Sequence, residues 1–420
     1  MALEDYKRNM EMCCRCSCCK FIPLERLEGY RYAHVCPSVA RYNFHAYSGG
    51  GRIGMGVGML ERRFEYSDTF LKVLYDCQMC GGCDVSCKYA MDMDVLDPIN
   101  EMRIACVGSG RTLPVLDRLR DNLRKTGVMV GKRTGQSEWA AGLDVAEVSE
   151  KKAKVVYHAG CRARSYEEQW KVSRAALALL KRAGIDVGIA REELCCGGRA
   201  YEMGYKEDFL TQAEKKMDQL RKSGAETLVT GCADCFHTLS VLYDRFAMKG
   251  DMEVLHTTEY LNRLIKEGRI EPTRKVEAKV VYHDPCHLGR LGEPYVPWEG
   301  KEIPGHIRLF DPPKELRRGT HGLYEPPREI LRSIPGIKLV EMERKREYAW
   351  CCGAGGGVEE SNPAFAAWTA KERMDEAIST GADALVTACS GCERSFRASA
   401  EKNGMPMKIF DVVELLEKAI

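Results

Sequence analysis

Residues 227–235 read Thr-Leu-Val-Thr-Gly-Cys-Ala-Asp-Cys, and residues 384–392 read Ala-Leu-Val-Thr-Ala-Cys-Ser-Gly-Cys. Each stretch is a short apolar run of the kind that forms a buried parallel strand, followed by two cysteines with a two-residue gap. Because this unit occurs twice, the sequence predicts an internal repeat.

The repeat extends to both sides of this unit. The same five residues, Lys-Val-Val-Tyr-His, precede Cys161 at 154–158 and Cys286 at 279–283. Adjacent cysteines follow in each copy, Cys195-Cys196 in the first and Cys351-Cys352 in the second, and each pair is followed by glycine. The tails at 252–261 and 407–416 also agree. Each copy therefore carries five cysteines in the order Cys, Cys-Cys, Cys-x2-Cys.

The second copy is longer than the first. The offset between the copies is 125 residues at the first cysteine and 156 at the cysteine pair, so about 31 residues are inserted between them. The insertion is expected within 291–327, a run rich in proline, glycine and charge that is typical of a surface excursion. It is either a loop without a further role, the favoured interpretation, or a docking surface for another protein of a complex.

The periodicities predict the fold class. Apolar runs at 154–157 and 227–230 indicate parallel strands, and the spacing of apolar residues indicates helices at 166–182 and 208–222. This order predicts α/β lobes, with the cysteines at the carboxyl ends of the strands, where such sheets bind ligands. We expect an α+β multidomain chain with a mainly helical N-terminal domain at 1–126, a linker at 127–153, and lobes at 154–275 and 276–420.

Five thiols in each copy need a metal site larger than one zinc ion. A four-ligand zinc site would leave one cysteine over, and adjacent cysteines have Cα atoms too close for an unstrained disulfide. Soft thiolates in this number favour an iron–sulfur assembly in which one sulfur bridges two irons. The adjacent glycines allow close backbone approach, so that successive N–H groups could donate to sulfur.

The five-cysteine pattern resembles the CCG domain of heterodisulfide reductase and its relatives, in both copies. The resemblance implies two non-cubane [4Fe-4S] clusters facing one cavity, in which a disulfide is bound and cleaved. By matched position, one cluster would be held by Cys161, Cys195, Cys196, Cys232 and Cys235, and the other by Cys286, Cys351, Cys352, Cys389 and Cys392.

The N-terminal domain carries a second type of cysteine motif. Cys77, Cys80, Cys83 and Cys87 have the spacing of a bacterial ferredoxin, in which the fourth cysteine reaches the other cluster. The partner motif is Cys13, Cys16 and Cys19, with Cys36 displaced. Crossed ligation would give one cubane [4Fe-4S] cluster on Cys13, Cys16, Cys19 and Cys87, and another on Cys77, Cys80, Cys83 and Cys36. Lys88 stands where ferredoxins have proline, and Cys14 and Cys18 compete as ligands.

Cys106 has no motif and is expected to be a buried free thiol.

This domain is similar to the helical ferredoxin type fused to CCG domains in D-type subunits of heterodisulfide reductase. Segments such as 36–38 and 44–50 look most like the subdivision found with class II benzoyl-CoA reductase complexes. The resemblance implies a place in a multi-subunit redox complex, with a flavin or ferredoxin-type electron donor.

Polar residues flank the first cysteine of each copy: His158, Arg162, Arg164, His283, Asp284 and His287. They could protonate thiolates or bind an anionic substrate. The favoured interpretation is that they cap strands and neutralise cluster charge, so no catalytic residue is assigned.

Composition excludes several classes of protein. The chain has 420 residues, 21 of them cysteine, and a net charge of +2, which gives no electrostatic footprint for nucleic acid. There is no export signal and no apolar run long enough for a membrane span, so a cytoplasmic protein is expected, peripheral to a membrane only through partners.

Three functions remain. In the first, the chain is an iron–sulfur oxidoreductase subunit of an anaerobe that passes electrons from two cubanes to two non-cubane clusters, which reduce a disulfide or similar acceptor. In the second, it is an electron-relay or bifurcation module of a larger complex, of the class II benzoyl-CoA reductase type, without substrate chemistry of its own. In the third, it is a zinc scaffold.

Overall fold

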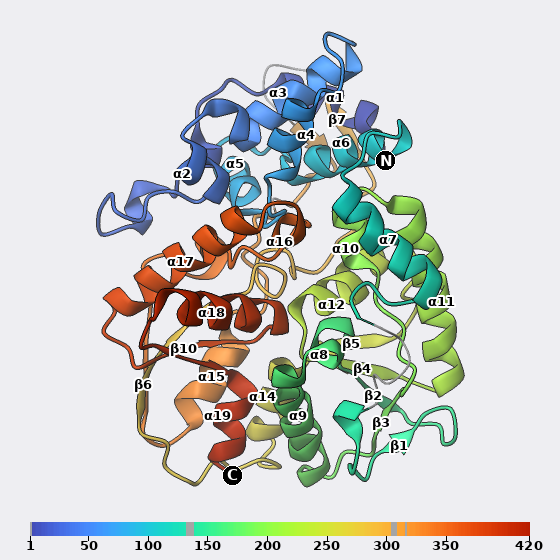
Figure 1. Cartoon of the computed structure of the whole chain (residues 1–420), viewed down its shortest axis with the longest axis vertical. Coiled ribbons are helices and arrows are strands. Elements are labelled where there is room, and N and C mark those ends of the chain that lie inside the picture. Colours follow the sequence, from blue (N-terminus) through green and yellow to red (C-terminus); the bar gives the residue numbers. More distant parts are fainter. Residues whose placement is uncertain (1, 132–137, 304–308, 316) are drawn as a thin grey trace.

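The computed structural model describes residues 2–131, 138–303, 309–315 and 317–420 (Figure 1). Helices form the N-terminal part of the chain. They are α1 (Lys7–Glu11), α2 (Pro37–Tyr42), α3 (Gly49–Leu60), α4 (Asp68–Tyr75), α5 (Gly82–Met91), α6 (Leu96–Gly108) and α7 (Pro114–Thr126). Ser48 and Ser67 cap α3 and α4 through their hydroxyl oxygens, which accept backbone N–H groups of the first turn. The predicted helical character of this part is confirmed.

The first lobe is built on a parallel sheet in the order β1-β3-β2-β4-β5. The strands are β1 (Ala146–Glu147), β2 (Val155–His158), β3 (Val187–Ile189), β4 (Thr227–Thr230) and β5 (Glu253–His256). The helices are α8 (Cys161–Ser165), α9 (Trp170–Arg182), α10 (Gly198–Glu202), α11 (Lys206–Ser223), α12 (Ala233–His237), α13 (Tyr243–Arg245) and α14 (Thr257–Lys266). A 3-10 turn at Glu167–Gln169 delays the start of α9 relative to the expected helix.

The second lobe repeats this arrangement. Its parallel sheet has the order β11-β10-β6-β9, which corresponds strand for strand to β5-β4-β2-β3. The strands are β6 (Ala278–Tyr282), β9 (Ile337–Val340), β10 (Ala384–Thr387) and β11 (Lys408–Asp411). The helices are α15 (Glu325–Ser333), α16 (Val358–Ser361), α17 (Pro363–Ser379), α18 (Ser390–Asn403) and α19 (Val412–Lys418). The predicted repeat and the parallel sheets are therefore confirmed.

The lobes share one hydrophobic core. Tyr157 and Val229 of the first sheet and Val281 and Val386 of the second belong to the same cluster of buried side chains. Across the boundary, α9 packs against α19 and α14 against α15, so the two lobes lie side by side below the N-terminal helices (Figure 1). Burial of apolar surface thus holds the two strand-end cysteine groups toward each other.

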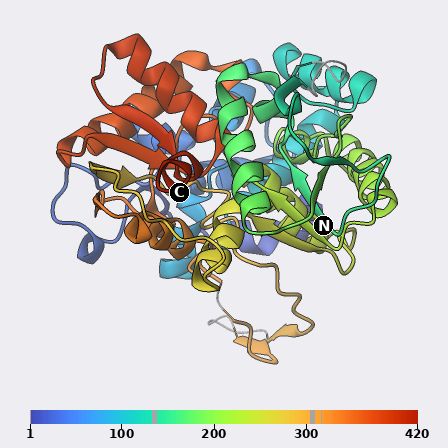
Figure 2. The ribbon, with the colours of Figure 1, turned by 90° about the horizontal axis from the view of Figure 1, so that it is seen from below.

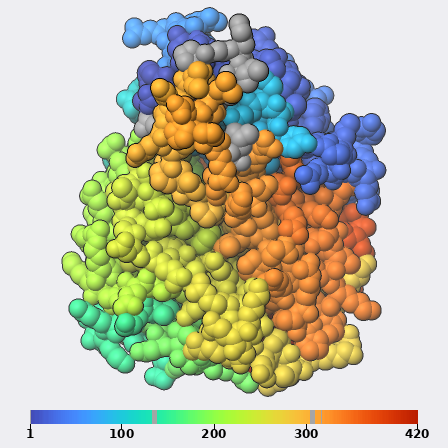
Figure 3. All heavy atoms as spheres, turned by 180° about the vertical axis from the view of Figure 1, so that it is seen from behind, coloured from blue at the N-terminus to red at the C-terminus, as the bar shows by residue number. Residues whose placement is uncertain are grey.

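The expected insertion lies between β6 and α15. Its described part contains an antiparallel hairpin, β7 (Lys301–Ile303) with β8 (Leu309–Asp311), which projects from the body (Figure 2). On the back face this orange segment lies beside the blue and cyan N-terminal region (Figure 3). An ion pair of 3.1 Å joins Arg8 of α1 to Glu302 of β7. Residues 304–308 and 316 of the insertion lie outside the described residues.

The segment predicted as a linker contacts the first lobe. Its β1 pairs with β3, and Trp139 is buried, with its carbonyl accepting a hydrogen bond from Arg174 on α9. Residues 132–137 of this segment lie outside the described residues. Within the described ranges, we find no helix whose length and apolar character would suit it to crossing a membrane.

Candidate functional site

The five thiols of the first lobe form one buried group at the carboxyl ends of its strands. Cys161 follows β2, and its sulfur lies 3.7 Å from that of Cys195. Cys196 is hydrogen-bonded to Cys195 and to Cys235, and Cys235 in turn to Cys232. These contacts lower the pKa of Cys196 to about 5 and raise that of Cys235 well above its usual value. We call this group the first-lobe site.

The second-lobe site has the same pattern of contacts. Cys351 is hydrogen-bonded to Cys286 and Cys352, and Cys392 to Cys352 and Cys389. All are buried except Cys286, which is half-buried. In each lobe, the five cysteines predicted as ligands therefore lie together in one group.

Backbone N–H groups surround the adjacent-cysteine pairs. The Gly197 and Gly353 N–H groups donate to Cys195 and Cys351 over 3.4 and 3.3 Å, respectively. Gly160 adopts φ +84°, and a Cβ there would lie 3.2 Å from the Cys235 sulfur. Glycine is thus required where backbone and thiol approach closely, and the donors are placed to stabilise sulfur anions.

The two lobe sites meet at a cysteine contact. Cys232 of the first lobe is hydrogen-bonded to Cys389 of the second, so the two Cys-x2-Cys motifs face each other. Hydrogen bonds from Cys232 and Cys392 lower the pKa of Cys389 to about 5. The repeat therefore places its ten thiols at one boundary.

The inner N-terminal site consists of Cys36, Cys77, Cys80 and Cys83. All four are buried, and burial together with the thiols of Cys36, Cys77 and Cys80 raises the pKa of Cys83 well above its usual value. Cys80 is hydrogen-bonded to Cys351, a contact that lowers the pKa of Cys80 to about 6 despite its burial. The inner site therefore adjoins the second-lobe site.

The outer N-terminal site contains Cys13, Cys16, Cys19 and Cys87. These thiols line one cavity together with Cys14, while Cys14 and Cys16 are exposed to solvent. Cys18 does not line this cavity but is hydrogen-bonded to Cys16. The grouping follows the crossed arrangement that the spacing predicts, because Cys87 on α5 reaches back to the earlier motif.

The two N-terminal sites share α5, which carries both Cys83 and Cys87. Gly49 fits between them, since a Cβ on Gly49 would lie 3.2 Å from that of Cys83 and 3.3 Å from that of Cys19. The four sites thus form a row: outer N-terminal, inner N-terminal, second-lobe, first-lobe. A chain of direct neighbours runs from the surface to the interior.

Buried cations surround this row. Among the residues that the structure describes, ten arginine and lysine side chains are at most 7% exposed: Arg52, Arg103, Arg162, Arg164, Arg199, Lys216, Arg290, Arg328, Arg344 and Arg373. Arg290 lies in the electrostatic range of Cys80, Cys286 and Cys351, and Arg103 in that of Cys77. Within the described residues, buried guanidinium nitrogens of Arg103, Arg199, Arg290, Arg344 and Arg373 have no hydrogen-bond partner.

This distribution of charge fits anionic groups held by the thiols. A buried guanidinium nitrogen without a hydrogen-bond partner is costly, whereas thiolate-ligated iron–sulfur clusters are polyanionic and accept hydrogen bonds at sulfur. Of these cations, the sequence pointed to Arg162 and Arg164 beside Cys161; the others were missed because no motif marks them. Asp234 lies inside the Cys232–Cys235 motif, but it was not singled out as a candidate site residue.

The flanking polar residues divide into two groups. His158 is hydrogen-bonded to the Glu193 carboxylate (2.9 Å), which also accepts the Ala159 and Gly160 N–H groups and so holds the loop before Cys161. Arg164 also binds Glu193, while His283 accepts from Arg373 and Asp284 binds Arg328. These contacts are internal and position the cysteine loops.

His287 and Arg162 instead line the cleft between the lobes, together with Asp234 and cysteines of the second-lobe site. His287 pairs with Glu202 over 2.5 Å and with Asp234 over 3.1 Å. Although burial opposes its charged form, these carboxylates raise the pKa of His287 well above its usual value. Its Nδ1 lies 3.5 Å from the sulfur of Cys286, so a proton is held beside that thiol.

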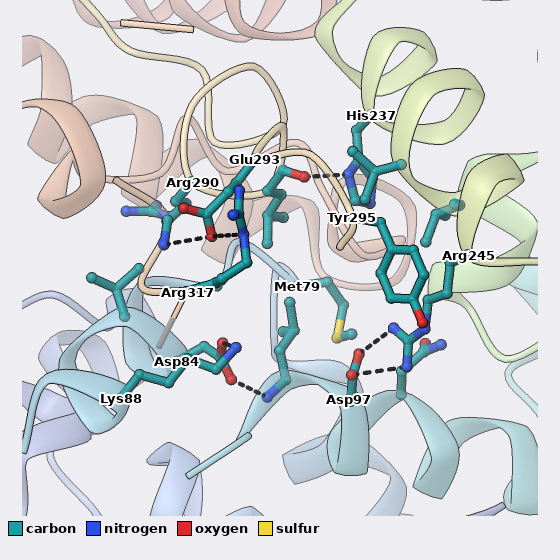
Figure 4. A pocket seen from close by; sticks show the side chains of 18 of the residues that line it. Met79, Asp84, Lys88, Asp97, His237, Arg245, Arg290, Glu293, Tyr295 and Arg317 are labelled. Carbon is teal, nitrogen blue, oxygen red and sulfur yellow. Dashed lines mark hydrogen bonds and ion pairs between the residues drawn. The ribbon is translucent and has the colours of Figure 1, made fainter. Parts of the chain in front are cut away.

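A cavity of about 180 Å³ lies next to this cleft, where the N-terminal helices, the first lobe and the insertion meet (Figure 4). Its wall includes Glu202 and His237, and the His237 and His287 rings are 5.1 Å apart. Arg290, Tyr295 and Arg317 line the insertion side. Glu202 of this wall pairs with His287, which in turn contacts the half-buried Cys286.

Cys106 is separate from these groups. Its side chain is 0% exposed, and burial raises its pKa to about 12.

Across the described ranges, no three His, Cys, Asp or Glu side chains are spaced to hold a single metal ion.

Comparison with known proteins identifies the repeat. The cysteine-rich domain family CCG matches residues 155–240 and 312–397. The D-type subunit of dihydromethanophenazine:CoB–CoM heterodisulfide reductase from Methanosarcina mazei is 29% identical, covering 84% of this chain and 79% of that protein. Its counterpart from Methanosarcina acetivorans is 28% identical, covering 98% and 94%. The chain is therefore similar to these D-type subunits over most of its length and carries two matches to the CCG domain family.

The chain also resembles a solved structure. A crystal structure of a hypothetical protein from Helicobacter pylori, 13% identical, matches with a TM-score of 0.53 over 89% of this chain and 67% of that chain, which shows a common fold alone. The second CCG match begins after Cys286, yet β6 occupies in its sheet the position of β2 in the first. The chain thus has the domains and homologues of an iron–sulfur oxidoreductase.

Proposed function

We propose that this chain is the subunit of an iron–sulfur oxidoreductase that reduces a disulfide, or a similar two-electron acceptor, in the cleft between its CCG lobes. The observation that carries the proposal is the row of four thiol sites that ends at the Cys232–Cys389 contact. A row from an exposed site to a cleft is what delivery of electrons to an acceptor requires.

The thiols divide among four cofactors. The outer and inner N-terminal sites would each hold a cubane [4Fe-4S] cluster, and the first-lobe and second-lobe sites would each hold a non-cubane [4Fe-4S] cluster. When bound, these clusters supply one-electron redox chemistry. The chain positions them through the N–H groups of Gly197 and Gly353 and the buried arginines, which neutralise negative charge.

The polar residues of the cleft supply protons and charge. Reduction of a disulfide consumes two electrons and two protons and yields two thiols. His287 holds a proton between Glu202 and Asp234, beside Cys286. Glu202 also lines the cavity of Figure 4, so it connects His287 to solvent and can restore that proton. Arg162, which pairs with Glu359, is the cation that lines the cleft and would face an anionic substrate group.

The alternative is an electron-relay or bifurcation module, as in class II benzoyl-CoA reductase-type complexes, with substrate chemistry on another chain. One observation favours it. Arg162 bridges the lobes by pairing with Glu359 over 2.8 Å and donating to the Ala354 carbonyl over 3.3 Å. Together with the Cys232–Cys389 contact, this bridge narrows the space open to a substrate. Redox partner subunits are expected in either case.

A thiol-dependent spectroscopic test separates the two functions. The protein as purified anaerobically is oxidised, mixed with a series of thiols and examined by EPR, and in parallel reduced viologen is offered with disulfides of varied charge. A disulfide reductase should show a new paramagnetic signal with at least one thiol and should oxidise viologen at a matching disulfide. If neither response occurs with any member of the series, the relay function is correct.

A further inference from the structure

A groove runs between the hairpin of the insertion and the carboxyl end of α5. On the hairpin side it is lined by Leu309, Phe310 and Lys314, and on the α5 side by Tyr89 and Met91. Leu309 is 55% exposed and Tyr89 43%. The groove encloses about 1130 Å³ of open space on the back face, where the insertion lies beside the N-terminal region (Figure 3). Its floor is apolar and accessible, as at protein-binding surfaces.

The groove adjoins the outer N-terminal site. Met91 lines both the groove and the cavity that holds Cys13, Cys16, Cys19 and Cys87, and Met12, next to Cys13, also lines the groove. Among the thiols of the four sites, only Cys16 is exposed. A molecule seated in the groove would therefore lie beside the site closest to solvent.

The rim of the groove is basic. Lys314 lies 5.7 Å from the ring centre of Phe310, and Arg318 lies 5.6 Å from that of Tyr89. Neither cation is held in an ion pair with a carboxylate of the groove in the contacts that the described residues show. Lys88 forms ion pairs with Asp84 and Asp94, and Arg15 lines the adjacent cavity. Asp92 is the one acidic residue lining this groove among the described residues.

We propose that this groove is the docking site of an acidic one-electron carrier protein of the ferredoxin class. The apolar floor supplies buried area, and Lys314 and Arg318 attract and orient carboxylates of the carrier. In each encounter the carrier is oxidised by one electron and this chain is reduced by one, with no bond made and no proton moved. This inference rests on the proposed function, because it requires that the outer N-terminal site exchanges electrons. It also gives the insertion a role.

Charge reversal on the rim tests the proposal. The double variant Lys314→Glu with Arg318→Glu is compared with a matched control, Arg182→Glu with Lys402→Glu, which reverses two exposed cations at the ends of α9 and α18. The probe is an acidic plant-type [2Fe-2S] ferredoxin, with binding measured by calorimetry and reduction of the chain by stopped-flow at two salt concentrations. Iron content checks that each variant is loaded.

The rim variant should bind the ferredoxin at least about tenfold more weakly at low salt and accept its electrons more slowly, with less dependence on salt. The control should match the wild type, and reduction by the small cationic donor methyl viologen should not fall in either variant. Equal ferredoxin affinity in the rim variant and the wild type, or no ferredoxin binding by the wild type, would overturn the proposal. So would loss of self-association in the rim variant, which would identify a second copy as the occupant.

The outcomes separate this inference from the proposed function. If ferredoxin binds and reduces the chain through the rim but no disulfide is consumed, the docking site stands and disulfide reduction fails. If viologen drives disulfide reduction while the rim variant binds ferredoxin normally, the function stands and the docking site fails.

Discussion

Replacing Cys351 by serine should remove about 4 of the iron atoms of each chain and disconnect the N-terminal sites from the lobes. Cys351 is 2% exposed and contacts Cys286, Cys352 and Cys80, so it lies where the second-lobe site meets the inner N-terminal site. Loss of residues around a metal ligand alone costs about 10- to 100-fold in affinity or activity, so loss of a ligand should lower acceptor-dependent oxidation of the donor by at least about 100-fold. Iron analysis and anaerobic turnover measure both effects.

Cys106→Ser is the matched control. This thiol is also buried but contacts none of the four sites, so the variant should keep its iron and its turnover while losing about 1–3 kcal/mol of stability from the buried hydroxyl. If Cys351→Ser retained full iron and turnover, the second-lobe site would not be a cluster site.

The second large effect is expected on stability, from Arg328→Met. Arg328 is 0% exposed and forms paired hydrogen bonds with Asp284 (2.6 and 2.9 Å) and with Glu341 (2.7 and 2.9 Å). Removing the guanidinium leaves the buried Asp284 carboxylate without its cation, at a cost of about 3–5 kcal/mol in the free energy of unfolding. Urea unfolding of the anaerobic protein, followed by circular dichroism, measures this loss.

Two variants control this prediction. Arg332→Met, on the same helix, removes an exposed cation paired with Glu325 at 3.5 Å and should change stability by less than about 1 kcal/mol. Arg328→Lys should recover only part of the loss, because an ammonium group cannot reproduce two paired hydrogen bonds. A loss in Arg328→Met no larger than in Arg332→Met would show that this network does not hold the Cys286 loop.

Much of the fold was predictable because it follows from local pattern. The strand-plus-cysteine units at β4 and β10 mark parallel strands by composition, and two copies of one pattern must fold alike. The same reasoning grouped Cys13, Cys16 and Cys19 with Cys87, since the ferredoxin spacing implies crossed ligation. Assignment of these thiols as ligands stays a prediction.

Contacts between the N-terminal domain and the lobes could not be predicted from the sequence. The Cys80–Cys351 neighbours are 271 positions apart and belong to different motifs, so no spacing relates them. Arg103 and Arg290 each cross between units to reach a carbonyl oxygen, Arg103 that of Gly356 and Arg290 that of Cys80. Such contacts depend on how the domains pack, which periodicity does not encode.

The insertion shows the same limit. Its proline, glycine and charge content predicts a surface segment, and the β7–β8 hairpin lies at the surface. Composition could not show that the hairpin lies beside α5, because this depends on long-range contacts such as the Arg8–Glu302 ion pair. Position, rather than composition, is what relates the insertion to the outer site.

The central claim is that all four thiol sites bind iron–sulfur clusters, and iron analysis tests it most directly. Protein purified and reconstituted without oxygen is assayed for iron and acid-labile sulfide per chain, with zinc measured on the same sample. Two cubanes and two non-cubane clusters predict about 16 iron atoms per chain. About 8 iron atoms per chain, as two cubanes alone would give, with all cysteines intact would contradict the assignment of the ten lobe thiols as cluster ligands. Stoichiometric zinc in a colourless protein would contradict the account as a whole.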